Sequence, residues 1–191
     1  MQARVITKAA KGRFGRFAAR LSKGRSGSAA VEFAMVALPF LALIMGILEI
    51  SMIYLVSTTL ENATSDVARQ IRTGQLQTTG GATAATFTAS ICSELSWLGS
   101  SCASKLYVDV RTFSTFANVT QPSPVNNGAV DPTALQFQLG AAGDIVLVRA
   151  FYQWTLFTPV LDGMAATLNG GSTLITATAA FKNEPYAAAG T

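Results

Sequence analysis

The chain has 191 residues, of which half are hydrophobic, 13% are charged and none is histidine, with a formal net charge of +4. The absence of histidine excludes Ser-His and Cys-His nucleophile pairs and the most common zinc sites. The sequence also lacks a Walker A loop and a Gly-x-Gly-x-x-Gly fingerprint. We therefore expect no catalytic residue, no metal site and no cofactor, although Ser-Lys or carboxylate-only chemistry stays open.

The positive charge is concentrated at the N-terminus. Eight of the fourteen Lys and Arg residues lie within residues 1–25, before the first acidic residue, Glu32, and the remaining six are outnumbered by ten Asp and Glu. The basic pI therefore describes the leader and does not indicate nucleic-acid binding. Beside an apolar segment, the basic block favours the cytoplasmic side of a membrane, which places the rest of the chain outside.

A long apolar segment follows the basic leader. From Ser28 to Val56 only Glu32 and Glu49 are charged. A helix of that length rises about 40 Å, enough to cross a hydrocarbon core of about 30 Å, so the segment predicts a membrane anchor. A secretory signal peptide is an alternative that fits less well, because its apolar region has only about 7 to 15 residues and lies ahead of its cleavage site. The Arg-rich leader also has features of a mitochondrial transit peptide, which is the second alternative.

The two carboxylates of this segment need partners, because a charge at mid-bilayer costs about 2.5 to 3.5 kcal/mol. Glu32 is one helical turn from Ser28, so it can reach the cytoplasmic interface. It can also pair with the α-amino group of Ser28 in a neighbouring subunit, fixing the register between helices, or contribute to recognition by a protease. Glu49 lies about 26 Å further along the axis, where we expect the opposite interface to solvate it.

The residues around this junction resemble the N-terminal pattern of TadE-like proteins, minor pseudopilins of the tight-adherence (Flp/Tad) branch of the type IV pilus machinery. The matching positions are Gly27, Ala30, Val31, Glu32, Phe33, Ala34, Pro39, Gly46, Ile47 and Glu49. The resemblance implies processing at Gly27, Ser28, Glu32 and Phe33, with cleavage after Gly27 by a prepilin peptidase. The major Flp pilin is much shorter and typically has Glu-Tyr at the junction, so a minor or initiating subunit is implied. Its implied partners are the prepilin peptidase, other pilins and pseudopilins, the inner-membrane assembly platform and membrane lipid, with no nucleic acid.

Beyond the anchor, helical periodicity continues in a different form. Leu60, Ala63, Val67 and Ile71 recur at three- and four-residue spacing, so residues 57–76 are expected to continue the helix as an amphipathic half. The remaining residues, 77–191, are expected to form a periplasmic α+β domain. Its expected elements are a short helix over 87–98, strands over 106–113, 144–157 and 173–181, and a long exposed connection over 118–131. The predicted fold is pseudopilin-like, with the long helix packed on a small antiparallel sheet and a second short helix.

Cys92 and Cys102 are the only cysteines. The expected topology places both on the oxidising side of the membrane, so we predict a disulfide between them. Closing this loop contributes about 2.8 kcal/mol on the loop-entropy relation. Two free buried cysteines are the alternative.

Two classes of function remain. In the first, a non-enzymatic structural subunit is cleaved after residue 27 and anchored in the bacterial inner membrane, with its N-terminus cytoplasmic and its domain periplasmic. It then contributes to assembly or initiation of an adhesive Flp/Tad pilus, or enters the fibre at the cell surface. In the second, an uncleaved single-span envelope protein presents a periplasmic binding or scaffold domain.

Overall fold

The structure is a computed structural model that describes residues 25–80 and 82–186. The basic leader, as far as residue 24, lies outside these ranges. Close contacts divide the chain into two compact units, Met1–Met45 and Gly46–Thr191. The helix α2 (Arg25–Arg72) supplies residues to both units.

The first unit consists, in its described part, of the N-terminal half of α2. Its large apolar side chains are exposed, among them Phe33, Met35 and Leu38. Within the described ranges, α2 is the one helix long and apolar enough to cross a membrane. Its most apolar 18-residue window has a mean hydropathy of 2.3, and only 6% of that window is buried. An apolar helix that is exposed all round fits a lipid environment better than the core of a soluble domain.

In the second unit α2 becomes amphipathic, as its sequence predicts. Leu60, Ala63, Val67 and Ile71 are all buried, while Glu61 on another face is exposed. Arg72 is the last helical residue, and Gly74 follows in the left-handed conformation with φ of 77°. The expected buried stripe is therefore confirmed. The short helix α3 (Gln75–Thr79) follows and ends at Gly80, where φ is 68°.

A three-stranded antiparallel sheet forms the centre of the second unit. Its strands are β1 (Leu106–Phe113), β4 (Ile145–Thr155) and β5 (Ser172–Lys182), in the order β1-β4-β5. The three predicted strands are confirmed, and β1 has the predicted bounds. The central strand is buried along its first eight residues, as expected for a strand covered on both faces.

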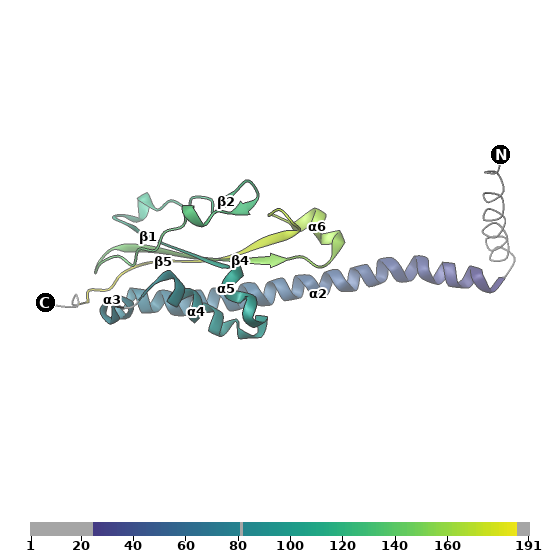
Figure 1. Ribbon diagram of the computed structural model, residues 1–191, viewed down its shortest axis with the longest axis horizontal. Helices are drawn as coiled ribbons and strands as arrows, with labels where there is room; N and C mark the ends of the chain where they lie inside the picture. The colour runs from purple at the N-terminus through teal and green to yellow at the C-terminus, as the bar shows by residue number, and fades with distance from the viewer. Residues whose placement is uncertain (1–24, 81, 187–191) are drawn as a thin grey trace, which may run out of the picture. The chain divides into compact units, whose positions relative to one another are not determined.

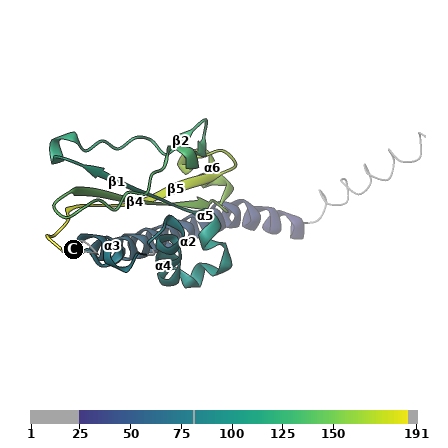
Figure 2. The same cartoon turned by 60° about the vertical axis from the view of Figure 1, so that its left-hand side comes forward.

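Different layers cover the two faces of the sheet (Figures 1 and 2). The second half of α2 and helix α4 (Ala84–Glu94) lie on one face, and the connection that carries β2 (Val125–Asn126) lies on the other. The predicted short helix ends at Glu94 rather than near Gly99, because a 3-10 helix, η1 (Ser96–Ser101), and the short helix α5 (Cys102–Lys105) complete the turn into β1. The predicted α+β fold is confirmed.

One continuous apolar core joins these layers. It contains side chains from α2, from α4 and from all three strands of the sheet. The members with no exposed surface are Val56, Leu60, Ile71, Ile91, Leu95, Val110, Val146, Val148 and Ala150. The second half of the long helix is therefore part of its own domain's core.

The connection between β1 and β4 is structured. It contains η2 (Phe116–Asn118), a small hairpin of β2 and β3 (Ala129–Val130), and η3 (Pro132–Ala134). The hairpin turns at Asn127-Gly128, both with positive φ, as a two-residue hairpin loop requires. Residues 136–138 then lie along β1, where Val110 donates its N–H to the Gln136 carbonyl at 2.8 Å.

The remaining helix, α6 (Pro159–Ala165), lies between β4 and β5 in the sequence. Thr158 precedes it as the N-cap residue, and proline occupies its first turn, where a missing N–H costs no intrahelical bond.

Candidate functional site

The expected processing junction lies at the start of α2. The bond between Gly27 and Ser28 falls within the first turn of the helix, which begins at Arg25. The Ser28 hydroxyl donates to Oε1 of Glu32 at 2.9 Å, so these two residues lie on the same face, one turn apart. Glu32 and Phe33 are both exposed and therefore accessible to another chain.

The second carboxylate of α2 has a different environment. Glu49 has no exposed surface. Its Oε1 accepts the backbone N–H of Phe157 at 2.8 Å, and its Oε2 accepts that of Thr158 at 2.9 Å. Among the described residues, no Lys or Arg nitrogen lies within ion-pair distance of this carboxylate.

The expectation that solvent at the membrane interface would hydrate Glu49 is therefore wrong. The loop after β4 covers this part of α2 and replaces water with two backbone donors. Thr158 is the N-cap residue of α6, and its amide has no intrahelical acceptor. Hydrogen bonds of this kind to an ionised acceptor offset part of its desolvation cost. Glu49 thus binds the N-terminal part of the second unit's helix to the loop between β4 and α6.

The C-terminal end of α2 is also bound to the rest of the second unit. Glu184, just after β5, donates its backbone N–H to the Arg72 carbonyl at 2.9 Å. The Arg72 guanidinium in turn donates two hydrogen bonds to Oε1 of Glu184, the shorter at 2.8 Å. Because this ion pair is about half exposed on both sides, the charge attraction adds little stability.

A buried charge cluster lies on the sheet face that the β1–β4 connection covers. Asp109 of β1 stands opposite Arg149 of β4 in the ladder and has no exposed surface. Its Oδ2 accepts from Arg149 Nη2 at 2.7 Å and from Arg111 Nε at 2.9 Å, and its Oδ1 accepts from the backbone N–H of Gln136 at 2.8 Å. Burial would raise the pKa of Asp109, but these hydrogen bonds, first those from Arg111 and Arg149, hold it below its usual range.

This cluster attaches the connection to the sheet. Arg149 donates to the Pro122 carbonyl at 2.8 Å, and Arg111 donates to the Ala134 carbonyl. The Arg149 guanidinium also lies 5.1 Å from the centre of the Phe151 ring, within the range of a cation–π contact. Since both arginines and the carboxylate are engaged by partners of the same chain, the cluster has a structural role. Asp109 is therefore not a solvated surface carboxylate.

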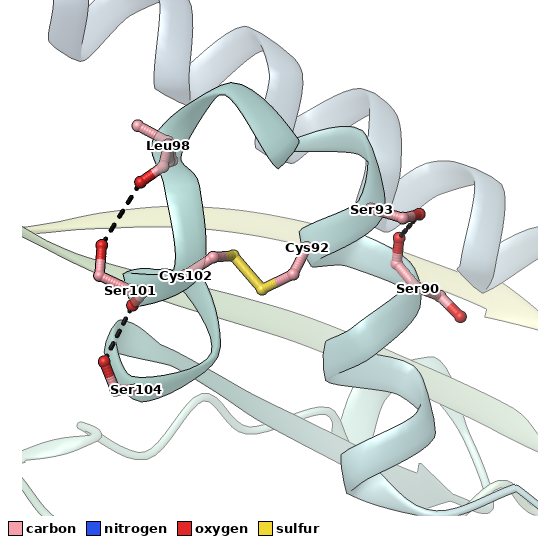
Figure 3. The surroundings of a disulfide bond; sticks show 7 residues. All are labelled: Ser90, Cys92, Ser93, Leu98, Ser101, Cys102 and Ser104. Atoms are coloured by element: carbon pink, nitrogen blue, oxygen red, sulfur yellow. Dashed lines mark hydrogen bonds between the residues drawn. A yellow bond between two sulfur atoms is a disulfide. The ribbon is translucent and has the colours of Figure 1, made fainter.

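The predicted disulfide is present. Cys92 in α4 is bonded to Cys102 at the start of α5, with the two Cα atoms 5.8 Å apart (Figure 3). Serine side chains near the bond donate to backbone carbonyls of the same turn, as Ser104 does to Ser101 at 2.9 Å. The bond therefore fixes α4 next to the turn that leads into β1. Within residues 25–80 and 82–186, no three His, Cys, Asp or Glu side chains are grouped so as to hold a metal ion.

Sequence reasoning missed both buried carboxylates. Arg149 interrupts an otherwise apolar central strand, and Asp109 and Arg111 share a face of β1, so complementary charge in two strands was an available signal. Glu49 gave no such signal, because its partners are backbone amides more than 100 residues away.

Together, the exposed apolar helix, the carboxylate one turn inside it and the sheet that packs on its second half define an α+β protein with a helix long and apolar enough to cross a membrane. Residues 27–69 match the family model described as TadE-like protein, so the chain is TadE-like over this stretch, as its junction predicts. The match associates it with the Tad pilus system and, in general terms, with other components of that system. No curated protein and no solved structure matches the chain.

Proposed function

We propose that this protein is a minor pseudopilin that contributes to assembly or initiation of an adhesive Flp/Tad pilus. The observation that carries the proposal is the junction itself. The family match begins at Gly27, the residue after which cleavage is expected, and the helix that follows is apolar and exposed. A helix with this surface needs lipid or neighbouring helices around it, and a pilus subunit meets both in turn.

Cleavage after Gly27 is compatible with the local structure. The first N–H groups of a helix have no intrahelical acceptor, so the first turn opens at a low free-energy cost. Glycine at this position also allows close approach of the backbone to catalytic groups of a prepilin peptidase. Because the cut precedes the apolar segment, the mature protein keeps its anchor.

The new N-terminus supports lateral assembly through Glu32. Cleavage creates an α-amino group on Ser28, and the Ser28 side chain already reaches Glu32 within one chain. In a bundle of such helices, the amine of one subunit supplies a counter-charge for the exposed Glu32 carboxylate of the next. The pair is favourable only when both charges are present, so it selects one axial register.

We further propose a topology with a cytoplasmic N-terminus and a periplasmic domain in the bacterial inner membrane. The basic leader favours the cytoplasmic side, and the disulfide between Cys92 and Cys102 favours an oxidising compartment for the domain. The role in this proposal is structural and not enzymatic. The direct partners are the prepilin peptidase, other pilins and pseudopilins, and the assembly platform.

The decisive experiment is determination of the mature N-terminus. The protein is purified from the native envelope, and its intact mass and N-terminal sequence are measured, with the same chain from a strain lacking the prepilin peptidase as control. A mature chain that begins at Ser28 only in the presence of the peptidase supports the proposal. Functional protein that retains Met1 overturns it and favours an uncleaved single-span envelope protein with a periplasmic binding or scaffold domain.

A further inference from the structure

Two large apolar side chains of the domain are exposed within eight residues of each other, between β4 and β5. Phe157 is 50% exposed, and Met164 in α6 is 81% exposed. Outside α2, the described residues include only two other exposed large hydrophobic side chains, Trp97 and Phe116. The β4–α6 loop, defined as residues 156–165, therefore holds half of this set within a short segment.

The contact with Glu49 fixes where this loop lies along α2. Both hydrogen bonds of the Glu49 carboxylate go to the loop, at Phe157 and Thr158. Within the same unit, α2 continues to expose apolar side chains past this point, including Tyr54 and Leu55. From Glu49 to Leu55 the helix rises about 9 Å. Glu49 therefore holds the loop beside a part of α2 whose exposed surface is still lipid-compatible.

The composition of the loop fits the same environment. Asp162 is its single charged residue. On α6, Asp162 lies about 160° around the helix from Met164, whereas Leu161 and Met164 are three positions apart and share a face. The loop therefore presents an apolar side that carries Met164.

We propose that Phe157 and Met164 insert into the interfacial layer of the bilayer, so that the β4–α6 loop is a second membrane contact beside the span. The partner is lipid and not a second protein, because Glu49 holds the start of the loop against a part of α2 whose exposed side chains, such as Tyr54 and Leu55, are apolar. Side chains of this kind bind a membrane by burying apolar area at the boundary between headgroups and acyl chains. The inference rests on the proposed membrane anchoring of α2. It adds that the domain rests on the membrane surface before assembly.

The test measures label depth in the full-length chain, reconstituted in vesicles of phosphatidylethanolamine and phosphatidylglycerol with its disulfide oxidised. A nitroxide is attached to a cysteine introduced by Met164→Cys or, in a second variant, by Phe157→Cys. Phe116→Cys is the matched control, because Phe116 is 58% exposed in the β1–β4 connection. Leu43→Cys reports the apolar half of α2 itself. For each label, collision rates with oxygen, which concentrates in lipid, and with a water-soluble nickel chelate are compared.

If the inference holds, the ratio of the oxygen collision rate to the nickel-chelate collision rate is several-fold higher for the labels at 157 and 164 than for the label at 116. Equal accessibility at all three positions, with a lipid-embedded label at 43, overturns the inference and leaves the anchoring intact. Protection of 157 and 164 from both reagents also overturns it, because it shows that protein covers the loop. A water-exposed label at 43 overturns the anchoring and the inference together. Unchanged thermal unfolding of each labelled variant shows that the fold is retained.

Discussion

The two halves of α2 form one continuous helix but meet different surroundings. In residues 25–45 the apolar side chains point outward in every direction, and the described part of this unit offers no sheet to cover them. In residues 46–72 apolar side chains such as Leu60 and Ile71 form a buried stripe, and from Glu61 onward the exposed face carries polar and charged side chains. The second half is therefore stabilised by its own domain, whereas the first half has an exposed apolar surface that fits a lipid environment.

The acidic residues of α2 repeat this contrast. Glu32 is exposed and open to a partner from another chain, while Glu49 is buried and satisfied by its own chain. Under the proposed function, the carboxylate of Glu32 serves assembly, whereas that of Glu49 serves folding. Burial in the monomer distinguishes the two roles.

The largest expected effect concerns the first half alone. Gly27→Val places a branched side chain at the cut site, and we expect it to block conversion of precursor to mature protein, whereas Gly27→Ala should only slow it. Pulse-chase labelling with gel separation of the two forms measures this directly. Normal conversion of the Val variant would exclude Gly27 as the cut site. Glu32→Ala should be cleaved at least in part yet fail to assemble, because it removes the counter-charge of the amine.

The second expected effect tests the packed half. Val67→Asp buries a charge without a partner in the core, and we expect it to cost about 5 kcal/mol and unfold the domain. Arg69→Asp, two positions away on an exposed face, should change stability by less than about 0.5 kcal/mol. Thermal unfolding and limited proteolysis of the full chain in detergent compare the pair. If both variants melt together, the second half of α2 is a tether and the contrast between the two halves is wrong.

The third expected effect concerns the cluster beneath the β1–β4 connection. Asp109→Asn leaves Arg111 and Arg149 without their counter-charge and should cost about 3 to 5 kcal/mol. Since the pKa of Asp109 is lowered on folding, its stabilisation is complete above the unfolded pKa of about 3.9 and is lost as pH falls through the lower folded value. Denaturant unfolding between pH 2 and 7 should therefore show a fall below about pH 4 that is weaker in the variant. An identical acid dependence would mean that other carboxylates cause it.

The fourth effect is smaller and separates the domain from the anchor. Replacing both Cys92 and Cys102 by Ala should lower the stability of the domain by about 2.8 kcal/mol. Membrane insertion of α2 should not change, because the disulfide lies wholly within the second unit. Alkylation before and after reduction, followed by mass spectrometry, reports the bond in protein from the native envelope. Two thiols that react freely before reduction would contradict both the bond and the proposed topology.

The smallest effect lies at the boundary between lipid-compatible and packed surface. Glu49→Gln keeps one acceptor for the loop and removes the charge, so we expect a cost of about 1 to 2 kcal/mol, with faster amide exchange at Phe157 and Thr158. Glu61→Gln is the matched control, since Glu61 is exposed on the same helix. Hydrogen exchange read by mass spectrometry measures the loop in both variants. Unchanged exchange in the Glu49 variant would show that the carboxylate does not hold the loop.

Much of the fold follows from local patterns in the sequence. The strand β1, the stripe on α2 and the short helix α4 were predictable because a buried face repeats with the period of its element. The disulfide was predictable because the chain has just two cysteines. These features depend on residues that are near each other in the sequence or unique in composition.

The attachments between elements could not be read in this way. Glu49 binds backbone amides at Phe157 and Thr158, and Asp109 binds that of Gln136. Every residue except proline has such an amide, so the residue type does not identify the partner. The partner of each carboxylate is determined only by where folding places the β4–α6 loop and the β1–β4 connection.

The two attachments of α2 within the second unit have a mechanical consequence. From Glu49 to Arg72 the helix is held at each end, and it runs beside β4 and β5 over the stretch between (Figures 1 and 2). Tension applied at the N-terminal end of this stretch therefore acts along the helix–sheet contact as shear. In shear, the buried side chains and the two end attachments carry the load together, whereas peeling would break them in succession. A protein built in this way can bear tension along its helix without stepwise unfolding of its domain.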